Sequence, residues 1–175
     1  MSSKEALQTL QTRLAERLQT VSDGKIAPHW LAVKVGTHGL LLPLSQSGEI
    51  YPWIEPHHVP YAKNWFLGVA NLRGSLCGVA SLAKYMDIDQ SAQANEPTVD
   101  SASTYLQDRR LVAFHPAFEI NTVLAVDQLA GLKSMDQLTA TDTQGIYLDR
   151  DQEKWRQIDL SLLAKNPHFV SIEAH

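Results

Sequence analysis

The sequence predicts a mainly β protein, a barrel or a sandwich, preceded by one helix. Short stretches of strand-like character recur from residue 30 onward, and turn signals containing Gly, Pro, Asp or Asn separate them. Little helical periodicity lies between these stretches, which argues against a parallel sheet built from strand–helix–strand units. Apolar residues make up 44% of the 175 residues, which is enough for a packed interior.

The predicted strands form two groups. The first comprises residues 30–35, 40–44, 49–54, 66–72 and 76–82, and the second comprises residues 110–114, 120–127, 129–132, 145–148 and 155–158. The stretch 87–104 between them holds mostly Gln, Ser, Asn, Asp and Ala, which indicates a mobile loop linking two subdomains. Gly131 is expected to mark a β-bulge.

Helices are predicted at the two ends of the chain and after the first group of strands. Residues 2–20 fit a helix, because Ser2 and Glu5 suit a capping box and leucines recur on one stripe at positions 7, 10, 14 and 18. This stripe could dock on the protein's own domain, dimerise or bind a partner. Short helices are expected over 82–86 and 159–164, the latter capped by Asp159. Residues 167–172 are expected to be extended.

The charge and the cysteine content exclude several classes of protein. The formal net charge is −4 and no basic stripe is visible, so we expect no nucleic-acid surface. No apolar stretch approaches the roughly 20 residues that span a bilayer, and the first residues lack the apolar region of a secretory signal. We therefore expect a soluble cytoplasmic protein without direct membrane insertion. The single cysteine, Cys77, fits a reducing compartment, and its apolar neighbours favour a buried, inert thiol.

The most informative segment is residues 65–74, which read W-F-L-G-V-A-N-L-R-G. It places Arg73 between a strand-like apolar stretch and Gly74. An arginine at such a turn suits a contact surface, because its planar fork binds backbone carbonyls and carboxylates of a partner. The alternative is a local ion pair or backbone bond that fixes the turn itself. The nearby glycines permit turns and close backbone approach.

This segment resembles the G-x-x-N-L-R-G signature of CheW-like chemotaxis coupling domains. Val59-Pro60 precedes it at the matching distance, and residues 75–82 follow as a second apolar strand. Within that family, the letters resemble the PilI-like branch, which serves type IV pilus twitching motility. The resemblance covers about residues 29–165 and leaves the leucine-striped helix outside. Two departures occur, since Gly78 and Ser81 stand where the family usually has Pro and Asp. We expect a more flexible and less polar strand end there.

The resemblance implies a fold of two SH3-like five-stranded barrels packed on a shared core, with an N-terminal helix. We expect three parts: a helix and linker over 1–28, a CheW-like domain over 29–165 and a C-terminal tail over 166–175. Within the domain, the first barrel would cover about 29–86 and receive the C-terminal return. The mobile loop would cover about 87–104, and the second barrel about 105–155.

The resemblance also implies a non-catalytic adaptor without a cofactor. Its partners would be a methyl-accepting chemoreceptor's cytoplasmic tip and the regulatory domain of a chemotaxis-type histidine kinase. The residues expected to bind partners are Gly68, Asn71, Arg73, Gly74 and Trp65. Trp65 is included because it immediately precedes the signature strand. Asp127 matches a Val-Asp of the family and is expected to cap a turn or bind backbone amides.

The main alternative is a β-barrel that binds a metal or small ligand through the loop with His57 and His58. Glu55 lies nearby, but no further Cys or acidic residues follow ligand spacing, so surface histidines are the competing interpretation. No phosphate-binding or nucleophile motif occurs, and we expect no catalysis. A second alternative is an SH3-like interaction module outside chemotaxis.

Overall fold

The computed structural model describes residues 30–88 and 107–173. The predicted helix over 2–20 and most of the predicted mobile loop over 87–104 lie outside these residues. The described chain is mainly β, with short α-helices α2 (Leu82–Tyr85), α4 (Leu160–Lys165) and α5 (Pro167–Val170) and 3-10 turns η2 (Pro116–Phe118) and η3 (Met135–Gln137). The mainly β prediction is therefore confirmed.

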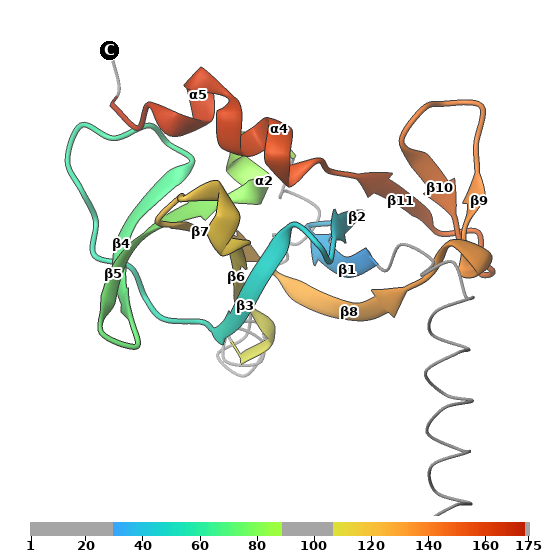
Figure 1. Ribbon diagram of the computed structural model, residues 1–175, viewed down its shortest axis with the longest axis horizontal. Coiled ribbons are helices and arrows are strands. Elements are labelled where there is room, and N and C mark those ends of the chain that lie inside the picture. The colour runs from blue at the N-terminus through green and yellow to red at the C-terminus, as the bar shows by residue number, and fades with distance from the viewer. Residues whose placement is uncertain (1–29, 89–106, 174–175) are drawn as a thin grey trace, which may run out of the picture.

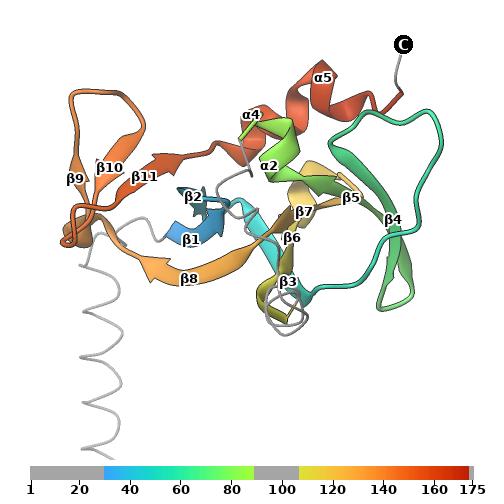
Figure 2. The ribbon, with the colours of Figure 1, turned by 180° about the vertical axis from the view of Figure 1, so that it is seen from behind.

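Two sheets of mixed direction form the body (Figures 1 and 2). The first, sheet A, has the order β8 (Gln128–Lys133), β1 (Trp30–Val35), β2 (His38–Pro43), β11 (Lys154–Gln157), β10 (Ile146–Leu148) and β9 (Thr139–Ala140). The second, sheet B, has the order β3 (Ser47–Pro52), β6 (Arg110–Phe114), β7 (Thr122–Val126), β5 (Ser75–Ser81) and β4 (Phe66–Leu72). Strands β9 and β10 lie at one end of the molecule, and the β4–β5 hairpin lies at the other.

The two sheets draw their strands from both halves of the chain. Strand β8 from the second half pairs with β1, and β3 from the first half pairs with β6. Each sheet therefore combines strands from both halves of the chain, and sheet A has six strands among the described residues where five were expected. Strands that follow one another in sequence are usually neighbours in space, and the β1–β8 and β3–β6 pairs depart from that tendency.

Most strand boundaries agree with the predicted ones to within a few residues, and the predicted bulge is confirmed. The β1–β8 register shifts between Ala32 and Val33, opposite the stretch that contains Gly131. Gly131 has φ of 102°, which a residue with a side chain adopts only with strain. The bulge therefore depends on the backbone freedom of this glycine.

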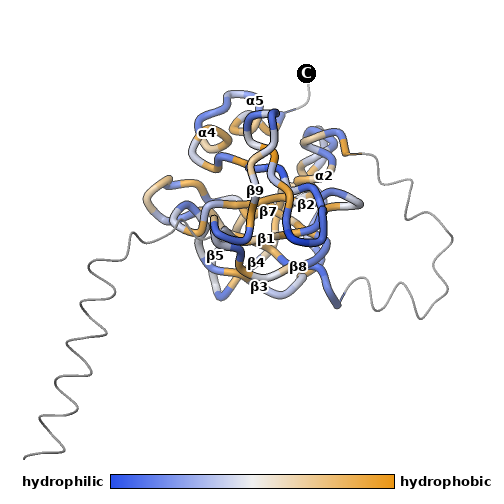
Figure 3. The backbone as a smooth tube through the Cα atoms, turned by 90° about the vertical axis from the view of Figure 1, so that its right-hand side faces the viewer, coloured by the Kyte–Doolittle hydropathy of each residue, from blue (hydrophilic) through white to orange (hydrophobic). Residues whose placement is uncertain are grey.

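Three hydrophobic clusters fill the molecule. The largest joins both sheets, with Val33 and Leu40 from sheet A against Val112 and Leu124 from sheet B. A second cluster lies within sheet B, and a third lies within sheet A around Trp155. Figure 3 shows the hydrophobic segments gathered in the middle of the chain trace. The shared core expected for the fold is thus the largest of the three.

The C-terminal segment is helical where an extended piece was expected over 167–172. Asp159 caps α4 as predicted, accepting hydrogen bonds from the backbone N–H of Ser161 and Leu162. Asn166 then caps α5, with a proline in its first turn. Phe169 of α5 is buried and stacks on Trp65, with ring centroids 5.2 Å apart. The prediction of an extended segment was wrong, because the Asn166 cap and the proline that follows it favour a helical turn.

Candidate functional site

The candidate site is the turn between β4 and β5, where Arg73 and Gly74 connect two antiparallel strands. Both residues have positive φ, 50° and 89°, as in the two-residue hairpin turns whose twist matches that of the strands. The Asn71 side-chain oxygen accepts a hydrogen bond from the Gly74 N–H at 2.8 Å. Asn71 therefore fixes the shape of the turn that presents Arg73.

The Arg73 side chain has local partners and is nevertheless accessible. It forms an ion pair with Glu49 of β3 and lies over the Tyr51 ring, 5.5 Å from the centroid. Strands β3 and β4 are the two edges of sheet B, so this contact links one edge to the other. The side chain is 72% exposed, and an ion pair that exposed contributes at most about 1 kcal/mol.

Gly68 has a different role from the turn residues, because it lies buried in β4 against the loop that contains His57. The backbone of His57 exchanges two hydrogen bonds with Val69, of 2.7 and 2.9 Å. A Cβ on Gly68 would lie 2.0 Å from the His57 carbonyl oxygen, and its φ is 136°. Gly68 thus permits the close approach that attaches the loop to β4.

Trp65 lies in the core, away from the surface that carries Arg73. It is 3% exposed, stacks on Phe169 and meets the Tyr85 ring edge-on at 5.5 Å. Of the five residues expected to bind partners, Asn71, Arg73 and Gly74 gather at the exposed turn. Gly68 and Trp65 are buried.

Leu76 extends the exposed surface beside the turn and was not singled out from the sequence. It is 61% exposed and pairs with Asn71 across the hairpin. The Asn121 amide holds this part of β5 by donating a hydrogen bond to the Leu76 carbonyl at 2.5 Å. The signal that could have identified Leu76 is its register opposite Asn71, which the two-residue turn dictates. We call Asn71, Arg73, Gly74 and Leu76 the hairpin tip.

The two departures from the family pattern have local explanations. The Phe66 ring lies over Gly78, since a Cβ there would be 2.9 Å from a ring carbon. The Ser81 hydroxyl accepts a hydrogen bond from the Lys84 N–H and so caps α2. The Ser81 position therefore keeps the capping ability that an Asp would supply.

Cys77 and Asp127 illustrate one expectation that fails and one that holds. Cys77 is half-buried, not buried, and burial raises the pKa of its thiol.

Asp127 accepts a hydrogen bond from the Gly36 N–H at 2.7 Å, so the prediction that it binds a backbone amide is confirmed. Asp127 thereby fixes the turn between β1 and β2.

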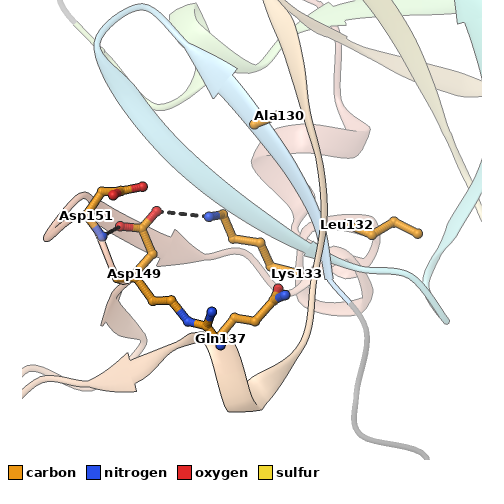
Figure 4. A pocket seen from close by; sticks show the side chains of 7 residues that line it. Ala130, Leu132, Lys133, Gln137, Asp149 and Asp151 are labelled. Atoms are coloured by element: carbon orange, nitrogen blue, oxygen red, sulfur yellow. Dashed lines mark hydrogen bonds and ion pairs between the residues drawn. The ribbon is translucent and has the colours of Figure 1, made fainter.

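A second polar cluster, which sequence reasoning missed, surrounds Asp149 in the turn between β10 and β11 (Figure 4). One carboxylate oxygen accepts hydrogen bonds from Lys133 Nζ and Trp155 Nε1, both at 2.9 Å. The other accepts two from the backbone N–H of Asp151 and Glu153, both at 3.0 Å. The carboxylate is saturated, which marks it as structural.

The pKa of Asp149 is set by opposing effects. Burial raises it, but the hydrogen bonds from Lys133, Trp155 and the two backbone amides outweigh burial and hold the pKa well below its usual range. An open hollow lies beside this cluster. Because every lone pair of Asp149 is used within the protein, the carboxylate has none left for a ligand in this hollow.

Two further observations bear on the kind of site. Among the residues that the structure describes, no group of three or more His, Cys, Asp or Glu side chains is placed to hold a metal ion. His57 and His58 are exposed, and His57 uses its backbone to pair with Val69. Within residues 30–88 and 107–173, no helix combines the length and apolar character that a bilayer crossing requires.

Comparison with known proteins agrees with this fold. Residues 29–155 match the family model described as the CheW-like domain. The scaffolding protein TtCheW from Thermoanaerobacter tengcongensis has a similar crystal structure, with a TM-score of 0.58 at 14% sequence identity. The match covers 80% of this chain and 89% of that one. A comparison with curated proteins finds no match. On the family match, which covers most of its length, the chain belongs to the CheW-like domain family.

Proposed function

We propose that this protein is a non-catalytic adaptor that couples a methyl-accepting chemoreceptor to a chemotaxis-type histidine kinase. The family match over 29–155 supports this role. The observation that carries it is the hairpin tip, an exposed turn with a cation, an amide and an apolar side chain on a rigid strand pair. Such a tip suits protein recognition, and the metal-binding alternative is not favoured.

Arg73 would be the exchangeable contact of this surface. Its ion pair with Glu49 is exposed and therefore weak, so a partner carboxylate or carbonyl can replace Glu49 at little cost. The guanidinium then gains a contact that desolvation at an interface strengthens. Asn71 and Gly74 would hold the turn in the shape that presents Arg73, while Gly68 and Trp65 would support it from the core.

The output of the pathway would be type IV pilus twitching motility. This assignment rests on the wording of residues 65–74, which resembles the PilI-like branch of the family. Contacts to kinase and receptor can each be weak in such a system, because an array of linked partners raises the effective affinity.

The test is a pull-down with the tagged full-length chain, followed by affinity measurements with the purified kinase regulatory domain and receptor tip. Arg73→Ala should weaken binding by about 1–3 kcal/mol while leaving the fold intact. Arg150→Ala is the matched control, since Arg150 is an exposed arginine in the turn between β10 and β11. If the wild-type chain captures neither a kinase nor a receptor, the adaptor role fails. If both variants bind like wild type, only the role of Arg73 fails.

A further inference from the structure

Strands β10 and β11 carry a second exposed surface, on the face of sheet A opposite Trp155. In their antiparallel register, Ile146 lies directly across from Arg156, and Leu148 lies directly across from Lys154. Residues across from each other in such a pair point to the same face of the sheet, and alternate residues along a strand share that face. The four side chains therefore form one surface, which we call the β10–β11 face.

This face continues the core side of sheet A beyond the buried core. Arg156 pairs with Leu40 of β2, and Leu40 is fully buried in the largest cluster, which joins the two sheets. Lys154 and Arg156 themselves are exposed. Ile146 and Leu148 are half-buried and, among the described residues, belong to none of the three hydrophobic clusters. The core side of sheet A therefore ends in a partly apolar surface that the described chain leaves open.

The carboxylates of the β10–β11 turn are engaged on the other side of the sheet. Glu153 forms an ion pair with Lys34, and Asp149 forms one with Lys133. Both lysines lie over the Trp155 ring, 5.9 and 4.6 Å from its centroid, on the side away from the β10–β11 face. Within residues 30–88 and 107–173, neither cation of the β10–β11 face forms an ion pair. The face therefore presents two unneutralised positive charges beside two aliphatic side chains.

This combination fits an acidic protein segment better than other anionic partners. A nucleic-acid surface needs a basic patch or stripe, and anionic membranes attract clusters of about four to eight basic residues. The β10–β11 face has only two. A side-chain carboxylate, in contrast, binds a single Lys or Arg through charge-assisted hydrogen bonds. An amphipathic segment also supplies an apolar side chain for the aliphatic pair, which a phosphate group does not.

The spacing of the two cations matches the spacing of side chains on a helix. Alternate residues of a strand are about 7 Å apart, and residues four apart in a helix are about 6 Å apart along its axis. The aliphatic pair lies about 5 Å to one side of the cations, across on β10. One face of a helix with acidic and apolar residues can therefore contact all four side chains at once.

We propose that the β10–β11 face binds an acidic amphipathic helix of a partner protein. Two carboxylates of that helix contact Lys154 and Arg156, and an aliphatic residue between them covers Ile146 and Leu148. Strands β9 and β10 lie at the end of the molecule away from the β4–β5 hairpin (Figures 1 and 2). This contact therefore leaves the hairpin tip open, and the inference stands independently of the proposed function.

Fluorescence anisotropy of labelled synthetic peptides, titrated with the full-length protein, tests this contact. The acidic peptide is an alanine-rich helix with two glutamates four residues apart and leucines on the same face. Its control peptide carries glutamines in place of the glutamates. Lys154→Gln combined with Arg156→Gln removes the two charges of the face. Lys84→Gln combined with Lys165→Gln is the matched control, because it removes the same charge from exposed lysines of α2 and α4. Circular dichroism checks that each variant is folded.

We expect the acidic peptide to bind wild type about ten-fold or more tighter than its glutamine control, because each carboxylate gains a charge-assisted bond. The face variant should lose this preference, and the matched control should keep it. Equal binding of the two peptides, or binding of neither, would overturn the proposal. Equal weakening by both double variants would do the same, since it would assign binding to overall charge. Tighter binding of a labelled oligonucleotide or of phosphatidylglycerol vesicles through Lys154 and Arg156 would assign the face to a phosphate-bearing partner and also overturn the proposal.

Discussion

Replacing Asp149 by Asn should destabilise the protein strongly although it changes only one atom. The variant keeps an oxygen acceptor for the backbone amides of Asp151 and Glu153, but it removes the charge that Lys133 and Trp155 bind. The Lys133 ammonium would then lie partly buried, with a side chain only 20% exposed. Removing one partner of a buried ion pair costs about 3–5 kcal/mol, a large part of the roughly 5–15 kcal/mol that stabilises a domain.

The assay is urea denaturation of wild type and Asp149→Asn at pH 7. Asp151→Asn is the matched control, because the Asp151 side chain is exposed and its change should stay within about 0.5 kcal/mol. Adding Lys133→Met to Asp149→Asn should restore part of the loss, since it removes the unpaired charge. A loss below about 1 kcal/mol for Asp149→Asn would refute the reasoning that this carboxylate organises sheet A.

The same carboxylate predicts a pH dependence. Its folded-state pKa lies below its unfolded value, so its contribution is fully present above the unfolded pKa and disappears as the pH falls toward the folded one. Wild type should therefore lose stability more steeply than Asp149→Asn below about pH 4. The gap between the two proteins should narrow with acidification, and a gap that widens would contradict the assignment.

Three further predictions concern Gly68 of β4, Phe169 of α5 and Glu49 of β3. Gly68→Ala should lower the free energy of unfolding, measured by thermal unfolding, by about 2–4 kcal/mol, because the added Cβ meets the His57 carbonyl. Gly145→Ala is the control: its added Cβ has open space, so it should cost only about 1–2 kcal/mol for the positive φ. Equal losses for the two variants would contradict the close approach of β4 to the His57 loop. Phe169→Ala should cost about 3–5 kcal/mol and exposed Val170→Ala under about 0.5, and a small loss for Phe169 would mean that α5 does not dock. Glu49→Gln should change stability by at most about 1 kcal/mol and leave partner affinity equal or higher, whereas a loss matching that of Arg73→Ala would show that Glu49 itself belongs to the interface.

Local patterns predicted the elements well because their causes are local. The turn at Arg73 and Gly74 follows from a Gly between two apolar stretches, and the cap at Asp159 follows from an acid before a short apolar run. The strand pairing across the two halves of the chain could not be predicted this way. Strand β3 pairs with β6 because of packing and register in the folded protein, and the sequence of neither strand indicates its partner.

Two side chains show why part of the candidate site escaped prediction. Trp65 is buried under Phe169, which lies far along the chain and stacks on it. No residue near Trp65 in the sequence predicts that contact. Asp149 and Asp151 belong to the same short polar stretch, residues 149–152. The distinction of Asp149 comes from Lys133 on β8 and Trp155 on β11, which only the folded sheet brings together.

The contacts of Lys133 and Arg73 suggest how one device serves two purposes in this protein. In each case a cation binds a carboxylate and lies over an aromatic ring, Lys133 at 4.6 Å from the Trp155 centroid and Arg73 at 5.5 Å from that of Tyr51. The two ion pairs differ in how far they are exposed to solvent. Lys133 and Asp149 are largely buried, so their bond is strong and is lost only at high cost. Arg73 and its carboxylate are exposed, so their bond is weak and open to exchange. The proposed adaptor role requires both properties, a body that keeps its shape and a contact that can change partners. Burial and the additional hydrogen bonds to Asp149 separate the two ion pairs here.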